Sequence, residues 1–513
     1  MAYMLGLDIG TSGVKALLVE DSGVIVGSAL QEYPFYSPHP GWTEQDPQDM
    51  WQGTIAALAK VLAKFNVDPK EIKGVGLSGQ MHSSVFLDNN GQVIRPAILW
   101  NDGRTTKQCR DIEALVGKDL LLAEACNPAL QGFTAPKVLW LRENEPENFA
   151  KVRWLVLPKD YIRYRLTGQI NMEISDAAGT LLLNVKQRTW SQRIMDKLNL
   201  PMEILPSLVN SAQIAGEITA EVAKLTGLVE GTPVVGGGAD NACGAVGSGI
   251  VKAGRAMISL GTSGVMLAHL DTPTLPTGGT IHMFNHAVTD KFYMMGVLLS
   301  AGLSYRWFRD ELGQMEQVVG NQLDEDAYTL LTKQASLSSP GSNGLLFLPY
   351  LTGERTPHAD GDARASFFGL GANHTRKDMI RSILEGVGFG FQDSLQLLRQ
   401  AGWEGSAVRC IGGGSKAILW REIIASMLDL QVQTLNSDEG PGLGAALLAG
   451  VGTGMFSDPT EASGAILQVT STVDPNPEWQ RIYQDLYPIY QGLYPALKTS
   501  FEQLAKIAPT LCV

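Results

Sequence analysis

Several features are scarce in this chain of 513 residues, and each scarcity argues against a class of protein. Cysteine occurs five times, at Cys109, Cys126, Cys243, Cys410 and Cys512, and no two cysteines form a CxxC pair. An odd number of distant cysteines argues against a disulfide framework or a structural zinc site and fits a reduced compartment. The sequence also lacks an apolar run of about 20 residues and a signal peptide. We therefore expect a cytoplasmic protein without a membrane partner.

Positive charge is scarce as well, because 40 Lys and Arg stand against 52 Asp and Glu, for a net charge of −12. This balance argues against a nucleic-acid binder, which needs a basic face. No GxxxxGK[ST] sequence occurs, so any ATP site is not a P-loop. The composition, 44% hydrophobic and 18% charged, is that of a globular protein, and the length suggests more than one domain.

One phrase occurs twice in the chain. Residues 9–14 (IGTSGV) return as residues 260–265 (LGTSGV), an offset of 260 − 9 = 251 residues. This offset is far longer than a solenoid period of roughly 20–50 residues, so it predicts two related domains. We place them at residues 1–248 and 249–513, with the boundary in the Gly/Ala-rich stretch 244–254.

Hydrophobic periodicity predicts an α/β protein whose second half repeats the order of the first. A helix should start at an Asp46 cap and bury one face through Phe65. The C-terminal segment 479–507 reads as a helix that Pro488 and Pro495 break or kink. Other expected elements are strands at 5–8, 14–19, 24–30, 72–77, 256–260, 265–269, 280–284, 292–297 and 407–411, and helices at 379–398 and 442–449.

The repeated phrase has the composition of a phosphate-binding turn. Glycine lets backbone N–H groups crowd around an anion, and Gly10, Thr11 and Ser12 add two hydroxyls. Asp8 at the mouth of the turn could hold Mg²⁺, and Lys15 could neutralise phosphate charge. A plain hairpin turn is the alternative. The second copy, with Gly261, Thr262 and Ser263 but with Ser259 in place of the aspartate, favours two phosphate turns and one metal anchor.

Asp240 is the candidate catalytic residue. It follows an apolar strand at 232–235 and the glycines 236–238, which place it at a strand-to-helix turn that a ligand can approach closely. A carboxylate there could accept a hydroxyl proton during phosphoryl transfer. The alternative is that Asp240 only caps the following helix.

Three further patterns allow less specific readings. Gly412, Gly413 and Gly414 follow a strand and, with residues 440–444, could form a nucleotide pocket. Residues 74–79 match GxGxxG, but the sequence after them reads as strand and not as helix, so we reject a dinucleotide site. His282 and His286 share a face if the segment is a strand, which leaves a metal pair open.

Taken in order, several blocks are similar to one family. They are DIGTSGVK (8–15), WTEQDP (42–47), GQMH (79–82), WNDGR (100–104), FTAPK (133–137), LPKDY (157–161), SDAAGT (175–180), GERTPH (353–358) and GGG (412–414). Together they resemble the FGGY carbohydrate kinases, of the actin, hexokinase and Hsp70 ATPase superfamily. Within that family the chain is most similar to the bacterial xylulokinases.

The resemblance implies two ribonuclease-H-like domains around a cleft, with sugar bound mainly by the first domain and ATP mainly by the second. It implies that Asp240 is the general base and that Asp8 lies at the Mg²⁺–phosphate site. The resemblance also suggests a homodimer. The remaining residues implied are Met81, His82 and Asn241 at the sugar, Thr262 and its neighbours at the transferring phosphate, and Trp307 with Gly412–Gly414 near the nucleotide.

The resemblance implies phosphorylation of D-xylulose to its 5-phosphate, with one departure. Ser83 follows the GQMH block where xylulokinases usually have Gly or Ala, and related gluconate kinases carry a similar serine. Gluconate or another pentulose, such as ribulose, is therefore the second acceptor. A non-catalytic actin-like or Hsp70-like ATP module and a sugar sensor are the rivals from another class. The GQMH block and the Asp240–Asn241 pair argue against the first, and the retention of Asp8 and Asp240 argues against the second.

Overall fold

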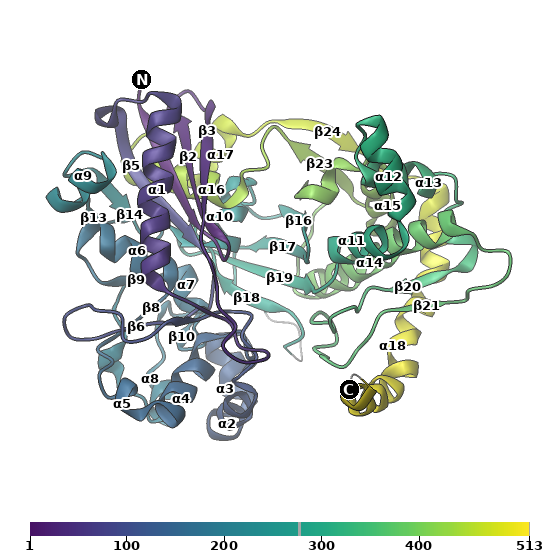
Figure 1. The fold of residues 1–513 in the computed structure, drawn as a ribbon, viewed down its shortest axis with the longest axis horizontal. Helices are drawn as coiled ribbons and strands as arrows, with labels where there is room; N and C mark the ends of the chain where they lie inside the picture. The colour runs from purple at the N-terminus through teal and green to yellow at the C-terminus, as the bar shows by residue number, and fades with distance from the viewer. Residues whose placement is uncertain (275–278, 512–513) are drawn as a thin grey trace.

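The computed structural model describes residues 1–274 and 279–511, which form two α/β domains side by side (Figure 1). The predicted fold class is confirmed. Cys109, Cys126, Cys243 and Cys410 are unpaired, and Cys512 lies outside the described residues. None of the described helices is both long enough and apolar enough to cross a bilayer.

The first domain is built on a mixed sheet in the order β13-β14-β5-β1-β2-β3. Its antiparallel part is β1-β2-β3, whereas β5 runs parallel to β1 and β14 runs parallel to β5. The short β15 (Gly238–Ala239) pairs with the end of β5. The bounds are β1 (Tyr3–Ile9), β2 (Gly13–Glu20), β3 (Ile25–Glu32), β5 (Ile72–Gly79), β13 (Ile214–Glu217) and β14 (Pro233–Val235).

The second domain repeats this pattern in a sheet of order β18-β19-β17-β16-β22-β23-β24. Here β16, β17 and β19 are antiparallel, while β22 and β23 continue parallel from β16. The repeated phrase therefore marks a repeated topology, with each copy in the turn after the first strand of its sheet. The bounds are β16 (Ala256–Leu260), β17 (Gly264–Leu270), β18 (His282–Asn285), β19 (Phe292–Leu298), β22 (Ala407–Ile411), β23 (Gln431–Leu435) and β24 (Val469–Val473).

Helices cover the sheets, and α1 (Pro47–Phe65) begins as predicted, with the Asp46 side chain accepting a hydrogen bond from the Gln48 N–H. Its buried face, which includes Trp51 and Leu58, packs on the first sheet. The other helices used below are α4 (Thr134–Asn144), α6 (Pro158–Thr167), α7 (Ile174–Ala178), α10 (Asp240–Gly247), α11 (Gly302–Leu312), α13 (Ala327–Ala335), α14 (Arg376–Gln400), α15 (Ile418–Leu428), α16 (Gly440–Gly452), α17 (Pro459–Ile466) and α18 (Pro477–Leu511).

Of the break or kink predicted at the two prolines, a break is ruled out, because α18 runs through Pro488 and Pro495. Proline has no backbone N–H to donate, so the helix lacks a hydrogen bond at each of these positions, and tertiary contacts hold it there. The Tyr487 hydroxyl donates to Asp393 at 2.6 Å, and the Tyr494 hydroxyl donates to Asp360 at 2.8 Å. The regularly spaced tyrosines thus pack against the second domain, as the sequence predicts.

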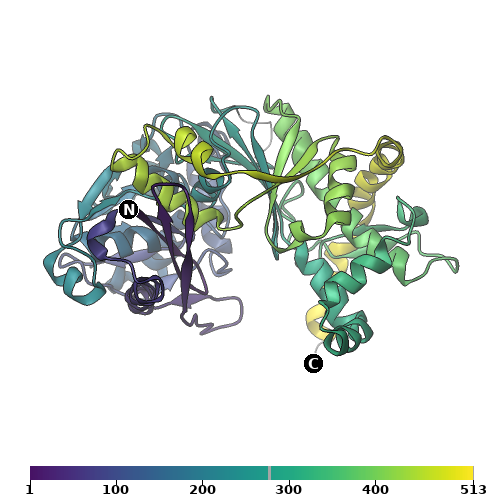
Figure 2. The same ribbon diagram turned by 90° about the horizontal axis from the view of Figure 1, so that it is seen from above.

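One segment of the second half crosses back to the first domain. Helices α16 and α17 lie on the first domain, and the yellow-green chain then returns to the second sheet as β24 (Figure 2). The approach of α16 to β1 and β5 is backbone to backbone. A Cβ on Gly76 would lie 1.9 Å from the Ala445 carbonyl oxygen, and one on Gly6 would lie 2.1 Å from that of Gly442. Only glycine fits at these two positions.

This packing gives a first prediction. Gly76→Ala should lower the free energy of unfolding by about 1–3 kcal/mol or more, because the methyl group forces α16 off the sheet. Gly492→Ala is the matched control, since Gly492 is exposed on α18 with nothing within 4 Å of a Cβ, and alanine favours a helix there. Urea denaturation of both variants measures the difference. Equal midpoints would contradict the packing argument.

Candidate active site

The first Gly/Thr/Ser turn connects β1 to β2 and is held from behind. The Tyr33 hydroxyl donates to the Gly10 carbonyl at 2.6 Å, and Gln45 Nε2 donates to the Thr11 carbonyl at 2.9 Å. The indole Nε1 of Trp100 donates to Thr11 Oγ1 at 3.0 Å. Ser12 is exposed. The turn is therefore fixed while its outer edge stays open to a ligand.

Asp8 lies on β1 just before this turn and is directly opposite Lys15 on β2. Burial raises the pKa of Asp8, while the nearby Lys15 charge lowers it. Lys15 is also paired with Glu439, whose carboxylate lies 3.0 Å from Lys15 Nζ. Glu439 immediately precedes α16, and its part in this site was not predicted. Only the crossing of α16 to the first domain brings it here.

Asp240 is the first residue of α10, whose N-cap is Ala239, so the helix-cap reading of Asp240 is wrong. Its Oδ1 accepts hydrogen bonds from the Asn241 backbone N–H at 2.7 Å and from Asn241 Nδ2 at 3.0 Å. Burial, and then the negative charge of Asp8, raise the pKa of Asp240 to about 7.

The strand pairing explains why Asp8 and Asp240 lie close together. Asp8 on β1 and Gly238 on β15 both pair with Ser78 of β5, one on each side. With strands spaced about 4.8 Å apart, the backbones at Asp8 and Gly238 are roughly 10 Å apart. The two carboxylates therefore face one region at the end of the first sheet.

Met81, His82 and Asn241 adjoin this region. Asn241 Nδ2 lies 3.6 Å from the Met81 sulfur, and so does the Tyr293 hydroxyl. His82 Nδ1 lies 2.7 Å from the Gly179 carbonyl oxygen, which can only accept, so Nδ1 carries the proton. Burial lowers the pKa of His82 to about 3. The ring is therefore neutral and presents Nε2 as a hydrogen-bond acceptor.

Lys137 supports His82 and was not predicted as a site residue, although it lies in the FTAPK block. Its buried Nζ, on α4, donates to the His82 carbonyl at 3.0 Å and to the Gly132 carbonyl at 2.6 Å. The Thr134 hydroxyl donates to the same His82 carbonyl at 2.9 Å. These bonds hold His82 in a left-handed conformation with φ of 67°. Burial lowers the pKa of Lys137 to about 7.

A small cavity of about 20 Å³ lies beside His82 and is formed by both domains. The first domain supplies His82, Trp100, Leu130, Gly132 and Phe133, and the second supplies His282, Phe284, Met295 and Arg355.

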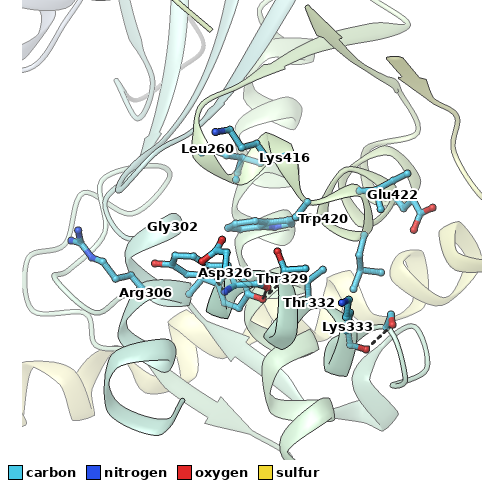
Figure 3. Close-up of a pocket in the computed structure, with 18 of the residues that line it drawn as sticks. Leu260, Gly302, Arg306, Asp326, Thr329, Thr332, Lys333, Lys416, Trp420 and Glu422 are labelled. Atoms are coloured by element: carbon cyan, nitrogen blue, oxygen red, sulfur yellow. Dashed lines mark hydrogen bonds between the residues drawn. The ribbon is translucent and has the colours of Figure 1, made fainter. Parts of the chain in front are cut away.

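A larger cavity of about 790 Å³ lies in the second domain (Figure 3). The second turn borders it and is tied to the start of α11, where the N–H groups of Gly302 and Leu303 donate to the Gly261 and Thr262 carbonyls, each at 2.9 Å. The cavity has the volume of a small-molecule site. Its lining includes Leu260, Gly261, Thr262, Gly302, Tyr305, Arg306, Tyr328, Thr329, Thr332, Lys333, Gly413, Gly414, Lys416, Ile418, Trp420 and Glu422.

This lining contains some of the predicted nucleotide residues and omits others. Gly261, Thr262, Gly413 and Gly414 border the cavity, whereas Ser263, Gly412 and Trp307 are not among its lining residues. Trp307 packs against the core, and its neighbours on α11, Tyr305 and Arg306, face the cavity instead. The lining from α13 and α15 was missed because these helices carry no motif.

The remaining candidate patterns are structural. No helix follows the GxGxxG match at 74–79, because β5 ends at Gly79 and the next element is the short strand β6 (Val85–Leu87). His282 Nδ1 lies 2.9 Å from Asn127 Oδ1, and His286 bonds the Ile250 carbonyl and the Val288 N–H. Among the described residues no group of three or more His, Cys, Asp or Glu could hold a metal ion. Both histidines of the pair make structural contacts in the described chain.

The donor set around the first turn fits Mg²⁺ nonetheless. Magnesium bound with a phosphorylated substrate takes one or two protein carboxylates, with phosphate oxygens and waters as the other ligands. Asp8 is a carboxylate whose burial disfavours its charge, and a cation would offset that cost.

Comparison with known proteins identifies the family of this chain. Residues 3–247 match the N-terminal domain of the FGGY family of carbohydrate kinases, and residues 256–453 match its C-terminal domain. A xylulose kinase of Bacillus subtilis is 42% identical over 494 residues, which cover 96% of this chain and 97% of that protein. A gluconokinase of Bacillus subtilis is 30% identical over 507 residues, 98% of each chain.

Among solved structures, one described as a xyloylose kinase from Brucella ovis is 37% identical. It superposes with a TM-score of 0.89 and covers 97% of this chain and 99% of that chain. The two matched domains and the relatives that cover nearly the whole chain lead to the same conclusion. The chain belongs to the FGGY family of carbohydrate kinases and is an ATP-dependent sugar kinase.

Proposed function

We propose that this kinase transfers the γ-phosphoryl group of ATP to O5 of D-xylulose, with Asp240 as the general base. The observation that carries the proposal is the Asp240 carboxylate, whose pKa is raised to about 7 and which lies beside both Asp8 and the Met81–Asn241 contact. A carboxylate of this pKa accepts a proton efficiently near neutral pH. The xylulose kinase relatives support the choice of acceptor.

Each side chain has a distinct part in the proposed reaction. His82 Nε2 and the Asn241 amide hold hydroxyls of the sugar, which keeps its terminal hydroxyl next to Asp240. Asp240 takes the proton of that hydroxyl as its oxygen forms the new bond to phosphorus. The large cavity holds the adenosine part of ATP, so that the phosphates lie between the two Gly/Thr/Ser turns.

Asp8 would hold Mg²⁺, which supplies charge neutralisation for the phosphates when it is bound. Lys15 contributes positive charge from the same side of the sheet, because it faces Asp8 across the β1–β2 pair. The open backbone of residues 10–12 offers N–H groups to phosphate oxygens.

Gluconate remains the second candidate acceptor, on the similarity to a gluconokinase. The serine that raised this alternative does not favour it, however. Ser83 is buried, and its hydroxyl donates to Gln80 Oε1 at 2.9 Å and accepts from the Trp100 N–H at 3.0 Å. Both bonds go to the scaffold, so Ser83 has no direct role in reading the acceptor.

We also propose a cytoplasmic location, which the four unpaired cysteines support. The homodimer remains a prediction that sedimentation velocity would check. The division of labour between residues 1–248 and 249–513, with sugar mainly on the first and ATP mainly on the second, is part of the proposal.

The first test is a panel of acceptors. ADP release should depend on added sugar, and D-xylulose should give the highest kcat/KM among D-xylulose, D-ribulose, L-ribulose, gluconate and glycerol, because relatives that are named for xylulose are the more similar ones. A coupled ADP assay measures all five. Preference for gluconate would overturn the substrate, and sugar-independent ATP hydrolysis would overturn the role of the acceptor.

Asp240→Asn tests the base. The amide keeps the shape but cannot accept the proton, so kcat should fall by about 10²–10⁴-fold while D-xylulose still binds. Ionisation of native Asp240 costs stability as pH rises from about 4 to 7, because its native pKa lies above the ordinary value. The variant should therefore melt at or above the wild-type temperature at pH 8, which shows that it is folded. Near-normal turnover would mean that another group is the base.

The same pKa predicts the pH dependence. Below about pH 7, kcat/KM should fall about tenfold per pH unit as Asp240 takes up a proton, because only the ionised form can act as a base. Initial rates at subsaturating D-xylulose between pH 5 and 9 measure this limb. A profile that stays flat down to pH 5 would contradict the raised pKa.

A further inference from the structure

The small cavity beside His82 is lined by one arginine, Arg355. Arg355 follows Glu354 on the segment after β20 (Leu346–Leu348), in the second domain, and yet it lines a cavity whose other wall belongs to the first domain. Its Nη2 lies 4.0 Å from the position of a Cβ on Gly132. The guanidinium thus reaches across the interface between the domains to the backbone beside Phe133.

This guanidinium has no ion-pair or hydrogen-bond partner among the residues the structure describes. The adjacent Glu354 does not pair with it, because the Glu354 carboxylate accepts the backbone N–H groups of Arg355 at 2.7 Å and of Leu299 at 3.1 Å. Burial raises the pKa of Glu354 to about 8, so it is largely neutral at pH 7. Arg355 is half-buried, and its unused donors are available to a ligand.

The other walls of the cavity are neutral and mostly apolar. Burial and the Arg355 charge both lower the pKa of His282 well below its usual value, and His82 is neutral as described above. The ring centroids of Phe133 and Phe284 lie 4.6 and 5.9 Å from that of His82 and 6.1 Å from each other. The cavity therefore offers one cation and two histidines in an otherwise apolar space.

The size of the cavity limits its occupant. About 20 Å³ is room for one water-sized group, since a single water needs about 10–15 Å³ by this measure. A hydroxymethyl or carbonyl end of a sugar fits such a space better than a bulkier group does. His82 lines this cavity and directly follows Met81, which contacts Asn241 next to Asp240, so an acceptor bound along His82 can extend from Asp240 to this cavity.

We propose that Arg355 is a specificity-determining residue, which donates hydrogen bonds from the second domain to the C1–C2 hydroxyketone end of the acceptor. This inference rests on the proposed function, because it takes D-xylulose to be bound with O5 at Asp240. The acceptor site is then completed by both domains, and the second domain supplies its positive charge.

The test compares D-xylulose with 1-deoxy-D-xylulose, which lacks only the C1 hydroxyl. In the Arg355→Gln variant, kcat/KM for D-xylulose should fall by about tenfold or more, mainly through KM, as expected for loss of hydrogen bonds to a charged donor. The preference for D-xylulose over the deoxy sugar should shrink by a similar factor. Arg355→Lys, which keeps the charge but loses the planar fork, should retain part of the preference.

Arg364→Gln is the matched control, because Arg364 is an exposed arginine nine residues further along whose bonds go only to nearby backbone carbonyls. It should leave both the kinetics and the preference unchanged. Melting curves for all variants, together with titration calorimetry of D-xylulose without ATP, separate loss of fold from loss of binding. An unchanged preference with an equal fall in kcat for both sugars would overturn the proposal, and so would unchanged kinetics in a folded variant.

The acceptor that the wild-type protein uses distinguishes a failure of the Arg355 proposal from a failure of the proposed substrate. Wild-type activity on D-xylulose with an unchanged preference in Arg355→Gln contradicts the arginine proposal alone. A wild-type protein that ignores D-xylulose and phosphorylates gluconate contradicts the substrate, and with it the hydroxyketone end assigned to Arg355.

Discussion

The whole site depends on backbone-to-backbone packing between α10 and α16. A Cβ on Gly444 would lie 1.8 Å from the Cys243 carbonyl oxygen, and one on Gly247 would lie 1.9 Å from that of Gly440. No side chain can separate helices that approach this closely. Because α10 begins at Asp240 and α16 follows directly after Glu439, this one contact joins the candidate base to a segment of the second half. The contact of α16 with β1 then brings Asp8 to the same place.

A buried cluster of charged side chains supports the segment that leads to Asp240. Lys159 and Arg163 on α6 donate to the Gly236 carbonyl, at 3.4 and 2.7 Å, and so fix the glycine strand that leads to Asp240. Their partners are the carboxyl groups of Asp160, Glu173 and Asp176, all with side chains of zero exposure. Burial raises the pKa of Asp176 well above its usual value, which favours its neutral form. These cations and carboxyl groups form one buried cluster behind the segment that positions Asp240.

The sequence predicts the fold better than it predicts the site, for a physical reason. Strand alternation and helix caps are local, so β16, β22 and the start of α1 are predicted to within a residue or two, and the repeated phrase predicts the repeated topology. The crossing of α16 is a long-range event without a local signal, and it is what brings Glu439 to Lys15. The cavity lining from α13 and α15 is likewise ordinary helix sequence. Lys137 could have been found, because it lies within an apolar helical stretch. A lysine that is buried there needs hydrogen-bond partners, which marks it as a residue with a specific role.

Trp100 contacts both the first Gly/Thr/Ser turn and the small cavity beside His82. Its indole N–H donates to Thr11 of the first turn, while the same side chain lines the small cavity with Arg355. Its backbone N–H is bonded to Ser83, next to His82. In the proposed reaction, one residue therefore borders the acceptor beside His82 and also holds a hydroxyl of the phosphate turn. Trp100 is 41% exposed, so it is open to a ligand at this point.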